Sequence, residues 1–250
     1  MNTVTEELPK ASAAPKAILL LIPGMLNDDA IWHGVVQALR ARVGDAVRVE
    51  IADVLTQSSI QGMACDAWKC LDGVAPGTAF YVAGFSMGGY VALEMLTNPK
   101  YPISEAWMLS TSALPETEIS LPMREKAIAS FESDFEKTIQ NTARWGMFEK
   151  TPEQLETAVE MMRRLGVATA VRQTRAIIKR RDLRESLRSL KVPVHIICGK
   201  EDRITPVALS QELAQTIPAA QLQIIEGAGH MLPFEQPDLI AESMKARIAA

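Results

Sequence analysis

The segment from Ala79 to Tyr90, AFYVAGFSMGGY, constrains the fold of this chain more than any other segment. A short apolar run with strand propensity stops at a serine flanked by glycines, and a helical pattern begins directly behind that serine. We therefore predict a buried parallel strand that turns sharply into a helix at Ser86. Gly84 and Gly88 stand in this turn where a Cβ atom would clash.

A serine in such a turn is a candidate nucleophile. Its hydroxyl projects beyond the carboxyl end of the sheet, beside helix amides that have no intrahelical partner and carry the positive end of the helix dipole. A serine hydroxyl is a weak nucleophile, so it needs a histidine base and an acid that orients this base. A single Gly-x-Ser-x-Gly pattern also fits an ordinary serine helix cap, and the rest of the chain has to decide between the two.

The candidate base is one of three histidines. His230 lies in GAGHMLPFEQP, a loop that follows the apolar run 221–225 and precedes the last expected helix. Two glycines hold the backbone open before it, and a loop at the carboxyl end of a strand is a common place for a functional residue. His33 falls inside an expected helix and His195 inside an expected strand, so we interpret both as structural and predict His230 as the base.

The candidate acid follows another strand. The run 192–199, VPVHIICG, reads as a buried strand, and the turn KEDRITP comes after it. Asp202 is the predicted acid, Glu201 is its alternative, and a solvated turn aspartate is the third interpretation. The order Ser86, Asp202, His230 along the chain is the order that this topology requires.

Two backbone amides are expected to bind the negative charge that forms on a substrate oxygen. The strand 18–22 ends in Pro23-Gly24, and the amide of Met25 follows it. We predict that the amides of Met25 and Met87 form an oxyanion hole, because backbone donors are already oriented when charge develops. Asn27 is interpreted as the cap of a helix that begins near it, with a side-chain donor role as the alternative.

Four segments together resemble the α/β-hydrolase superfamily, over nearly the whole chain: LLIPGMLNDDAIW, GFSMGG, GKEDRITP and GAGHMLPFEQP. The resemblance implies a serine hydrolase that cleaves a carboxylic ester or thioester of a small to medium acyl group through an acyl-enzyme. It implies no metal and no organic cofactor. Many relatives have His-Gly where this chain has Pro23-Gly24, a difference that bears on substrate detail more than on activity.

The coarse pattern of strands and helices agrees with this fold. Strand and helix alternate over 17–111 and again over 191–250, which predicts a mainly parallel sheet of about six strands with helices on both faces. Residues 112–190 show helical periodicity without clear strands, and we predict a helical cap there. Residues 1–16 are expected to form a flexible tail.

Apolar residues of the expected cap are candidates for an acyl pocket above Ser86. We predict that Trp145, Met147, Phe148 and Met161 line it, because such side chains adapt to an apolar ligand. For each of them, packing between cap and sheet is the alternative.

The expected cap is also strongly basic between residues 163 and 188. Arg172, Arg175 and Lys179 fall at helical spacing and form a basic stripe. The stripe is either a solvated helix face or a surface that binds an anionic substrate or an acidic acyl-carrier protein. The second interpretation draws on the carrier-linked methyl esterases to which this chain is similar in size and layout.

Composition and charge narrow the classes of function that this chain can have. A chain of 250 residues with 48% hydrophobic residues can bury a large core, and a net charge of -4 argues against nucleic-acid binding. No apolar run is long enough to span a membrane, and the first residues do not resemble a secretion signal. The three cysteines, without metal-ligand spacing, fit a reducing compartment, so we expect a cytoplasmic enzyme with a small-molecule ester substrate.

Three alternative functions are compatible with the same residues. One is cleavage of an enol-lactone or of a carbon–carbon bond in a ring-fission product, which calls for an arginine in the pocket. The others are cofactor-free perhydrolase chemistry and a non-catalytic small-molecule receptor. Haloalkane dehalogenation is disfavoured, because it needs an aspartate in place of Ser86.

Overall fold

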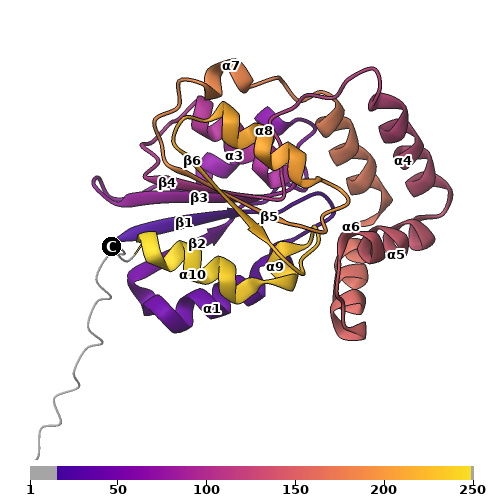
Figure 1. The fold of residues 1–250 in the computed structure, drawn as a ribbon, viewed down its shortest axis with the longest axis horizontal. Helices are drawn as coiled ribbons and strands as arrows, with labels where there is room; N and C mark the ends of the chain where they lie inside the picture. Colours follow the sequence, from indigo (N-terminus) through magenta and orange to yellow (C-terminus); the bar gives the residue numbers. More distant parts are fainter. Residues whose placement is uncertain (1–15, 249–250) are drawn as a thin grey trace, which may run out of the picture.

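The computed structural model describes residues 16–248, so nearly all of the expected tail lies outside the described residues. Six strands form one all-parallel sheet in the order β2-β1-β3-β4-β5-β6 (Figure 1). Their bounds are β1 (Ala17–Ile22), β2 (Val47–Ile51), β3 (Ala79–Phe85), β4 (Glu105–Leu109), β5 (Val194–Gly199) and β6 (Ala220–Ile225). The predicted parallel sheet of the α/β-hydrolase fold is confirmed.

Helices cover both faces of this sheet. One face carries α1 (His33–Val43), α9 (Leu232–Glu235) and α10 (Pro237–Ile248), and the other carries α2 (Ile60–Ala67), α3 (Met87–Thr97) and α8 (Val207–Thr216). Short 3-10 turns complete the connections at η1 (Asp29–Trp32), η2 (Gly44–Ala46) and η3 (Trp68–Leu71).

The central strands are buried on both faces, as parallel strands between two helical layers must be. In β1, Leu20 packs into the apolar core on the α3 side, while its neighbour Leu19 packs into the core on the α1 and α10 side. Strand β6 is an edge strand, and Ile224 on it is 39% exposed. The core is thus centred on β1, β3, β4 and β5, whose ends position the loops described below.

Between β4 and β5 the described chain forms helices and no strand. These are α4 (Leu121–Ser133), α5 (Phe135–Gly146), α6 (Pro152–Ile178) and α7 (Arg184–Leu187). Figure 1 shows α4, α5 and α6 together beyond the carboxyl ends of the strands, where they pack on one another. Gly166 interrupts α6 with φ 75° and ψ 171°, so that α6 consists of two helical parts with different directions.

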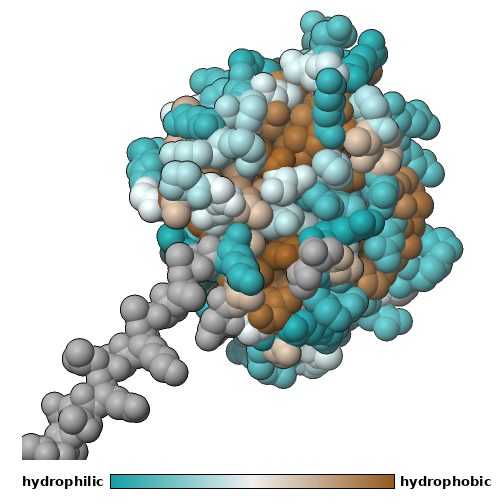
Figure 2. All heavy atoms as spheres, turned by 90° about the vertical axis from the view of Figure 1, so that its left-hand side faces the viewer, coloured by the Kyte–Doolittle hydropathy of each residue, from teal (hydrophilic) through white to brown (hydrophobic). Residues whose placement is uncertain are grey.

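The opposite end of the molecule faces the viewer in Figure 2. Apolar areas on this face alternate with hydrophilic side chains. Because the amino ends of the strands point this way, their carboxyl ends point toward α4, α5 and α6. No described helix is both long enough and apolar enough to cross a membrane.

Candidate active site

The turn between β3 and α3 holds Ser86 in an unusual backbone conformation. Its φ is 52° and its ψ is -115°, a region that residues with a side chain rarely adopt. Two contacts from the end of β4 fix this conformation. The Ser86 amide donates to the carbonyl of Leu109 at 2.9 Å, and the Thr111 hydroxyl donates to the Ser86 carbonyl at 2.8 Å. The strain therefore persists because the end of β4 binds both the amide and the carbonyl of Ser86.

The glycines around Ser86 are required by close backbone approaches. A Cβ on Gly84 would lie 2.3 Å from the carbonyl oxygen of Gly88, and a Cβ on Gly88 would lie 2.2 Å from that of Ile22. Helix α3 therefore begins directly against the backbone of the last residue of β1. This packing brings the turn at Ser86 next to the loop that follows β1.

The structure brings Ser86, His230 and Asp202 into one chain of hydrogen bonds. The Ser86 Oγ lies 3.0 Å from His230 Nε2, and His230 Nδ1 lies 2.9 Å from Asp202 Oδ2. His230 and Asp202 are buried, whereas Ser86 is partly exposed. An imidazole oriented by a carboxylate is thus within reach of the serine proton, which is the arrangement that activates a hydroxyl nucleophile.

The Asp202 carboxylate is bound by its own turn as well as by the histidine. The amides of Ile204 and Thr205 each donate to Oδ1 at 2.8 Å, and the Thr205 hydroxyl donates to Oδ2 at 2.7 Å. Burial raises the pKa of Asp202, but the charge and hydrogen bond of His230 and the donors of Thr205 outweigh burial and hold this pKa below its usual value. Asp202 is therefore the ionised partner that a charged imidazole needs.

Glu201, the alternative acid, has another partner. Its Oε2 accepts from the amide of Ala228 at 3.1 Å and so ties the acid turn to the loop before His230. The hydroxyl of the buried Thr205, a residue that the motifs did not indicate, donates to Asp202 and also lies 3.1 Å from His230 Nδ1. Its place three residues after the acid, where a side chain can close an aspartate turn, is the sequence signal that could have identified it.

The loop of His230 is joined to the end of α5. The carbonyl of Gly146 accepts from the amides of His230 at 2.7 Å and of Met231 at 3.1 Å. The Glu235 carboxylate accepts from the amides of Gly229 and Phe148, both at 2.9 Å. Helix α5 is thus attached to the backbone of the histidine.

Glu235 itself is a partly buried acid that the sequence pattern does not indicate. Burial raises its pKa above the usual value, although the amides of Gly229 and Phe148 counteract part of this rise. Its other oxygen, Oε1, is buried without a hydrogen-bond partner among the described residues. The only hint in the sequence is its position, five residues after His230 at the end of the same loop.

The two predicted oxyanion amides come from neighbouring strand ends. Ile22, the last residue of β1, is opposite Gly84 of β3, so the loops that carry Met25 and Met87 leave the sheet side by side. Met87 is the first residue of α3, where amides lack intrahelical acceptors. The Met25 amide has no hydrogen-bond acceptor within residues 16–248.

Asn27 does not cap the helix that follows. Asp28 does so instead, because its Oδ1 accepts from the amide of Ala30 at 3.1 Å. The buried Asn27 amide donates to the carbonyl of Leu26 at 3.1 Å and lies 4.0 Å from the sulfur of Met161. Asn27 therefore shapes the loop that carries Met25.

The four residues expected to line a pocket lie in different surroundings. Met147 and Met161 are fully buried in the apolar core shared with α1 and α10. Phe148 is partly buried. Trp145 is 58% exposed, and the guanidinium of Arg203 lies 5.1 Å from the centre of its ring. Of the four, Met161 is the one that contacts the loop after β1, through Asn27.

Most of the basic residues between 163 and 188 are bound within the protein. Arg172 donates to the carbonyl of Leu55 at 3.1 Å. Six others form ion pairs with acidic residues: Arg163 with Glu136, Arg164 with Asp28, Arg180 with Glu116, Arg181 with Glu94, Arg184 with Asp182 and Arg188 with Glu185. Within the described residues, Arg175 and Lys179 of the basic stripe are exposed and have no acidic partner.

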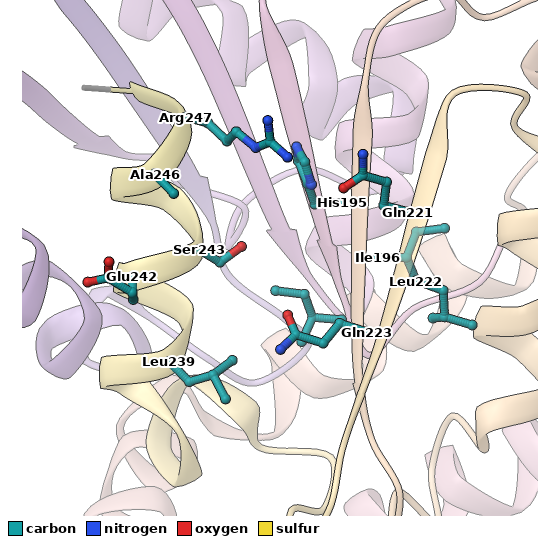
Figure 3. A pocket seen from close by; sticks show the side chains of 11 residues that line it. His195, Ile196, Gln221, Leu222, Gln223, Leu239, Glu242, Ser243, Ala246 and Arg247 are labelled. Atoms are coloured by element: carbon teal, nitrogen blue, oxygen red, sulfur yellow. The ribbon is translucent and has the colours of Figure 1, made fainter. Parts of the chain in front are cut away.

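A hollow of about 520 Å³ lies away from these residues, between α10 and the strands β5 and β6 (Figure 3). His195 and Gln221 face Arg247 at one end of it, and none of its lining residues belongs to the Ser86 cluster. The His195 ring stacks on Trp107, with 5.2 Å between ring centres, and its Nε2 lies 2.5 Å from a Glu105 oxygen. His195 is thus a structural residue of the sheet, and the hollow is unrelated to the candidate site.

Comparison with known proteins shows the family of this chain. The model of the alpha/beta hydrolase family matches residues 19–243. The chain belongs to this family. The structure also resembles that of a thermophilic esterase from Thermogutta terrifontis, with a TM-score of 0.79 and 21% sequence identity, over 93% of this chain and 89% of the other.

Two curated relatives are similar in sequence to this chain. One is the AB hydrolase superfamily protein YisY of Bacillus subtilis (strain 168), 27% identical over 169 residues, which are 64% of this chain and 62% of the relative. The other is a pimeloyl-[acyl-carrier protein] methyl ester esterase of Neisseria meningitidis serogroup C / serotype 2a, strain FAM18, 26% identical over 162 residues, which are 61% of this chain and 62% of the relative. The match thus spans less than two thirds of each relative.

Proposed function

We propose that this protein is a serine hydrolase that cleaves a carboxylic ester or thioester of a small to medium acyl group. The observation that carries the proposal is the hydrogen-bonded chain from Ser86 Oγ through His230 to Asp202. Each member follows a different strand, β3, β6 or β5, at the same end of one sheet. Family membership and the printed names of the esterase relatives support the same class of reaction.

The first half-reaction forms an acyl-enzyme. His230 Nε2 accepts the proton of Ser86 as the serine oxygen attacks the substrate carbonyl. The amides of Met25 and Met87 hold the negative oxygen of the tetrahedral intermediate. His230 then protonates the leaving alkoxide or thiolate, and the acyl group remains on Ser86.

The second half-reaction uses the same groups on water. His230 takes a proton from water, the hydroxide attacks the acyl-enzyme, and Ser86 leaves with the proton that His230 returns. Asp202 stabilises the charged imidazole in both halves and keeps its Nδ1 proton directed inward. These steps need no metal and no organic cofactor.

We assign the nucleophile to a serine and not to a thiol. All three cysteines are free, and burial raises the pKa of Cys70 and of Cys198 above its usual value, which disfavours the thiolate form of both. Free thiols also suit a reducing compartment, and we propose the cytoplasm.

We further propose that residues 112–190 act as a cap over Ser86. The contacts of Gly146 with the His230 loop and of Met161 with Asn27 support this role, because both join the helical segment to the loops of the site. A cap that excludes water strengthens the electrostatic interactions beneath it. Met161 and Met147 would then form the inner wall of an acyl pocket, and the exposed Trp145 would lie at its outside.

The test is hydrolysis of p-nitrophenyl esters with acyl chains of graded length. We expect turnover that peaks within one range of chain length, and we expect Ser86→Ala to lower kcat by at least about 10⁴-fold while the thermal unfolding curve stays the same. Ser112, another buried serine near the turn, provides the matched control as Ser112→Ala.

Two results would contradict the proposal. Near-normal ester turnover in Ser86→Ala would reject the nucleophile. Tight binding of an ester without turnover by the wild type would favour the receptor alternative, and peroxide-dependent halide oxidation without ester cleavage would favour the perhydrolase.

We propose that Arg175 and Lys179 guide an anionic or carrier-linked substrate, since they are the exposed cations of the basic stripe without a partner in the described part of the chain. Two surface charges together contribute about 1 to 2 kcal/mol, or roughly tenfold in binding. Arg175→Glu with Lys179→Glu should lower kcat/KM about tenfold for an acyl-carrier-linked ester and leave kcat/KM for a neutral p-nitrophenyl ester unchanged.

The matched control is a charge reversal far from residues 112–190, at Arg40 and Lys100, both exposed. It should leave both kcat/KM values unchanged. Equal losses on the two substrates, or equal losses in the control, would reject this role. Arg172 is unsuitable for the test, because it anchors α6 to Leu55.

A further inference from the structure

Gln173 is a fully buried polar residue in the second helical part of α6. Its Oε1 accepts from the amide of Leu26 at 2.8 Å, and its Nε2 donates to the carbonyl of Val54 at 3.0 Å. A neutral amide supplies an acceptor and a donor at once, which is what these two backbone groups require in the core. Gln173 thus joins the helical segment to the loop after β1 and to the chain after β2.

The loop that Gln173 binds is under backbone strain. Leu26 has a φ of 55°, a left-handed conformation that costs a leucine about 1 to 2 kcal/mol. Such a conformation persists only where the surroundings fix it. At Leu26, Gln173 binds the amide, Asn27 binds the carbonyl, and the side chain is buried.

The neighbouring residue of α6 holds the preceding position of the loop. The hydroxyl of Thr174 lies 3.7 Å from the sulfur of Met25. Helix α6 therefore contacts the Met25 side chain and, through Gln173, binds the peptide group that joins Met25 to Leu26. The Met25 amide belongs to the preceding peptide group, which joins Gly24 to Met25. It has no hydrogen-bond acceptor within residues 16–248.

We propose that Gln173 is a positioning residue for the oxyanion hole, a role that rests on the proposed function. By holding the strained turn at Leu26, Gln173 sets the direction of the Met25 amide toward the substrate oxygen. The amide is needed most when the oxygen becomes negative, so its misplacement lowers kcat more than it raises KM. The helical segment thereby completes the catalytic site as well as covering it.

The main test variant is Gln173→Met, which keeps the volume and removes both hydrogen bonds. Loss of a whole oxyanion donor costs about 10² to 10³ in kcat, so we expect a displaced donor to lower kcat by about 10-fold to 100-fold, with KM changed less than about threefold. The inhibition constant of a trifluoromethyl ketone, whose adduct with Ser86 carries the same negative oxygen, should rise by the same factor as kcat falls.

Two control variants separate this role from simple anchoring of the helix. Arg172→Met removes the adjacent bond from α6 to Leu55 without touching Leu26, and its kcat should stay within about threefold of the wild type. Gln173→Glu keeps an acceptor for the Leu26 amide, and its kcat should exceed that of Gln173→Met. If Gln173→Met does not fold, Gln173→Ala, which leaves space for a bridging water, takes its place with the same expected loss of kcat.

Rates are normalised to the amount of enzyme that reacts with a fluorophosphonate, so that unfolded protein does not count. Wild-type kcat in Gln173→Met, an equal loss in Arg172→Met, or a change in KM alone would overturn the positioning role. Failure of the proposed function gives a different result, because the wild type itself would then neither cleave esters nor form the adduct.

Discussion

At the scale of single residues, Asp202 is held by more groups than a three-residue catalytic motif includes. Thr205 donates to its carboxylate with both the amide and the hydroxyl, and the hydroxyl also reaches His230 Nδ1. A hydrogen bond to a charged group contributes about 1.5 to 3 kcal/mol. The orientation of Asp202, and through it of His230, therefore depends on Thr205.

We expect Thr205→Val, which keeps the shape and loses the hydroxyl, to lower kcat about tenfold or more. Thr205→Ser retains the donor and should keep kcat close to that of the wild type. Steady-state kinetics on one p-nitrophenyl ester measures both variants. An active Thr205→Val enzyme, or a Thr205→Ser enzyme as impaired as Thr205→Val, would show that the hydroxyl does not matter.

Thr205→Val and the wild type should also differ in the pH dependence of stability. The pKa of Asp202 is lowered in the folded protein, so its ionised form stabilises the fold above the unfolded pKa of about 3.9, and this stabilisation is lost as the pH falls through the folded pKa. Without the Thr205 hydroxyl the pKa moves back toward its usual value. The Tm of Thr205→Val should thus lie below that of the wild type near neutral pH, and this gap should narrow below about pH 4.

Sequence alone could place Ser86, Asp202 and His230 near one another, because each follows a strand in a recognisable short motif. It could not identify Gln173 or Glu235. Each binds a backbone amide of a distant segment, at Leu26 for Gln173 and at Phe148 for Glu235, and no local pattern encodes a hydrogen bond across 147 or 87 residues. Backbone acceptors and donors are the same at every position, so only the fold selects them.

At the scale of elements, the contact between α3 and β1 determines where the candidate nucleophile lies. Gly88 is in the first turn of α3, and a Cβ there would meet the carbonyl of Ile22 at 2.2 Å. The backbone of a buried strand cannot move away from such a contact, whereas the end of a flexible side chain can. The alternation of strands and helices predicted this arrangement, since a helix that directly follows its strand has to pack back onto the sheet.

We therefore expect Gly88→Ala to lower the free energy of unfolding by about 1 to 3 kcal/mol and to reduce kcat, because the turn at Ser86 must shift. Gly62→Ala in α2 is the matched control, since a Cβ there meets side chains and no backbone, at 3.1 Å from the Ser59 hydroxyl and 3.5 Å from the Gln57 Cβ. Urea unfolding and ester kinetics measure both variants. A Gly88→Ala enzyme as stable and active as Gly62→Ala would contradict the close approach.

The helical segment between β4 and β5 illustrates what periodicity cannot predict. Helical spacing placed Arg172, Arg175 and Lys179 on one stripe, but the structure binds Arg172 to Leu55 and leaves the other two exposed. Arg180, nearby in the sequence, is buried against Glu116, 64 residues earlier. Charge spacing along a helix indicates a shared face and does not show which charges other segments neutralise.

At the scale of the whole molecule, the fold supports the class of chemistry and says little about the substrate. The six parallel strands followed from the sequence pattern, whereas their order in the sheet comes from the structure, and the family match covers most of the chain. Pocket shape depends on how α4, α5 and α6 pack, which residue spacing did not determine. The exposure of Trp145, expected in the pocket, is the clearest example.

The most direct test of the account is to treat the protein with a fluorophosphonate and locate the adduct by mass spectrometry. We predict one adduct, on Ser86, that is absent from Ser86→Ala and forms much more slowly in His230→Ala, because His230 Nε2 is the base that activates the serine. An adduct on another serine, or an equally fast reaction in His230→Ala, would contradict the central claim that Ser86, His230 and Asp202 act as one catalytic unit.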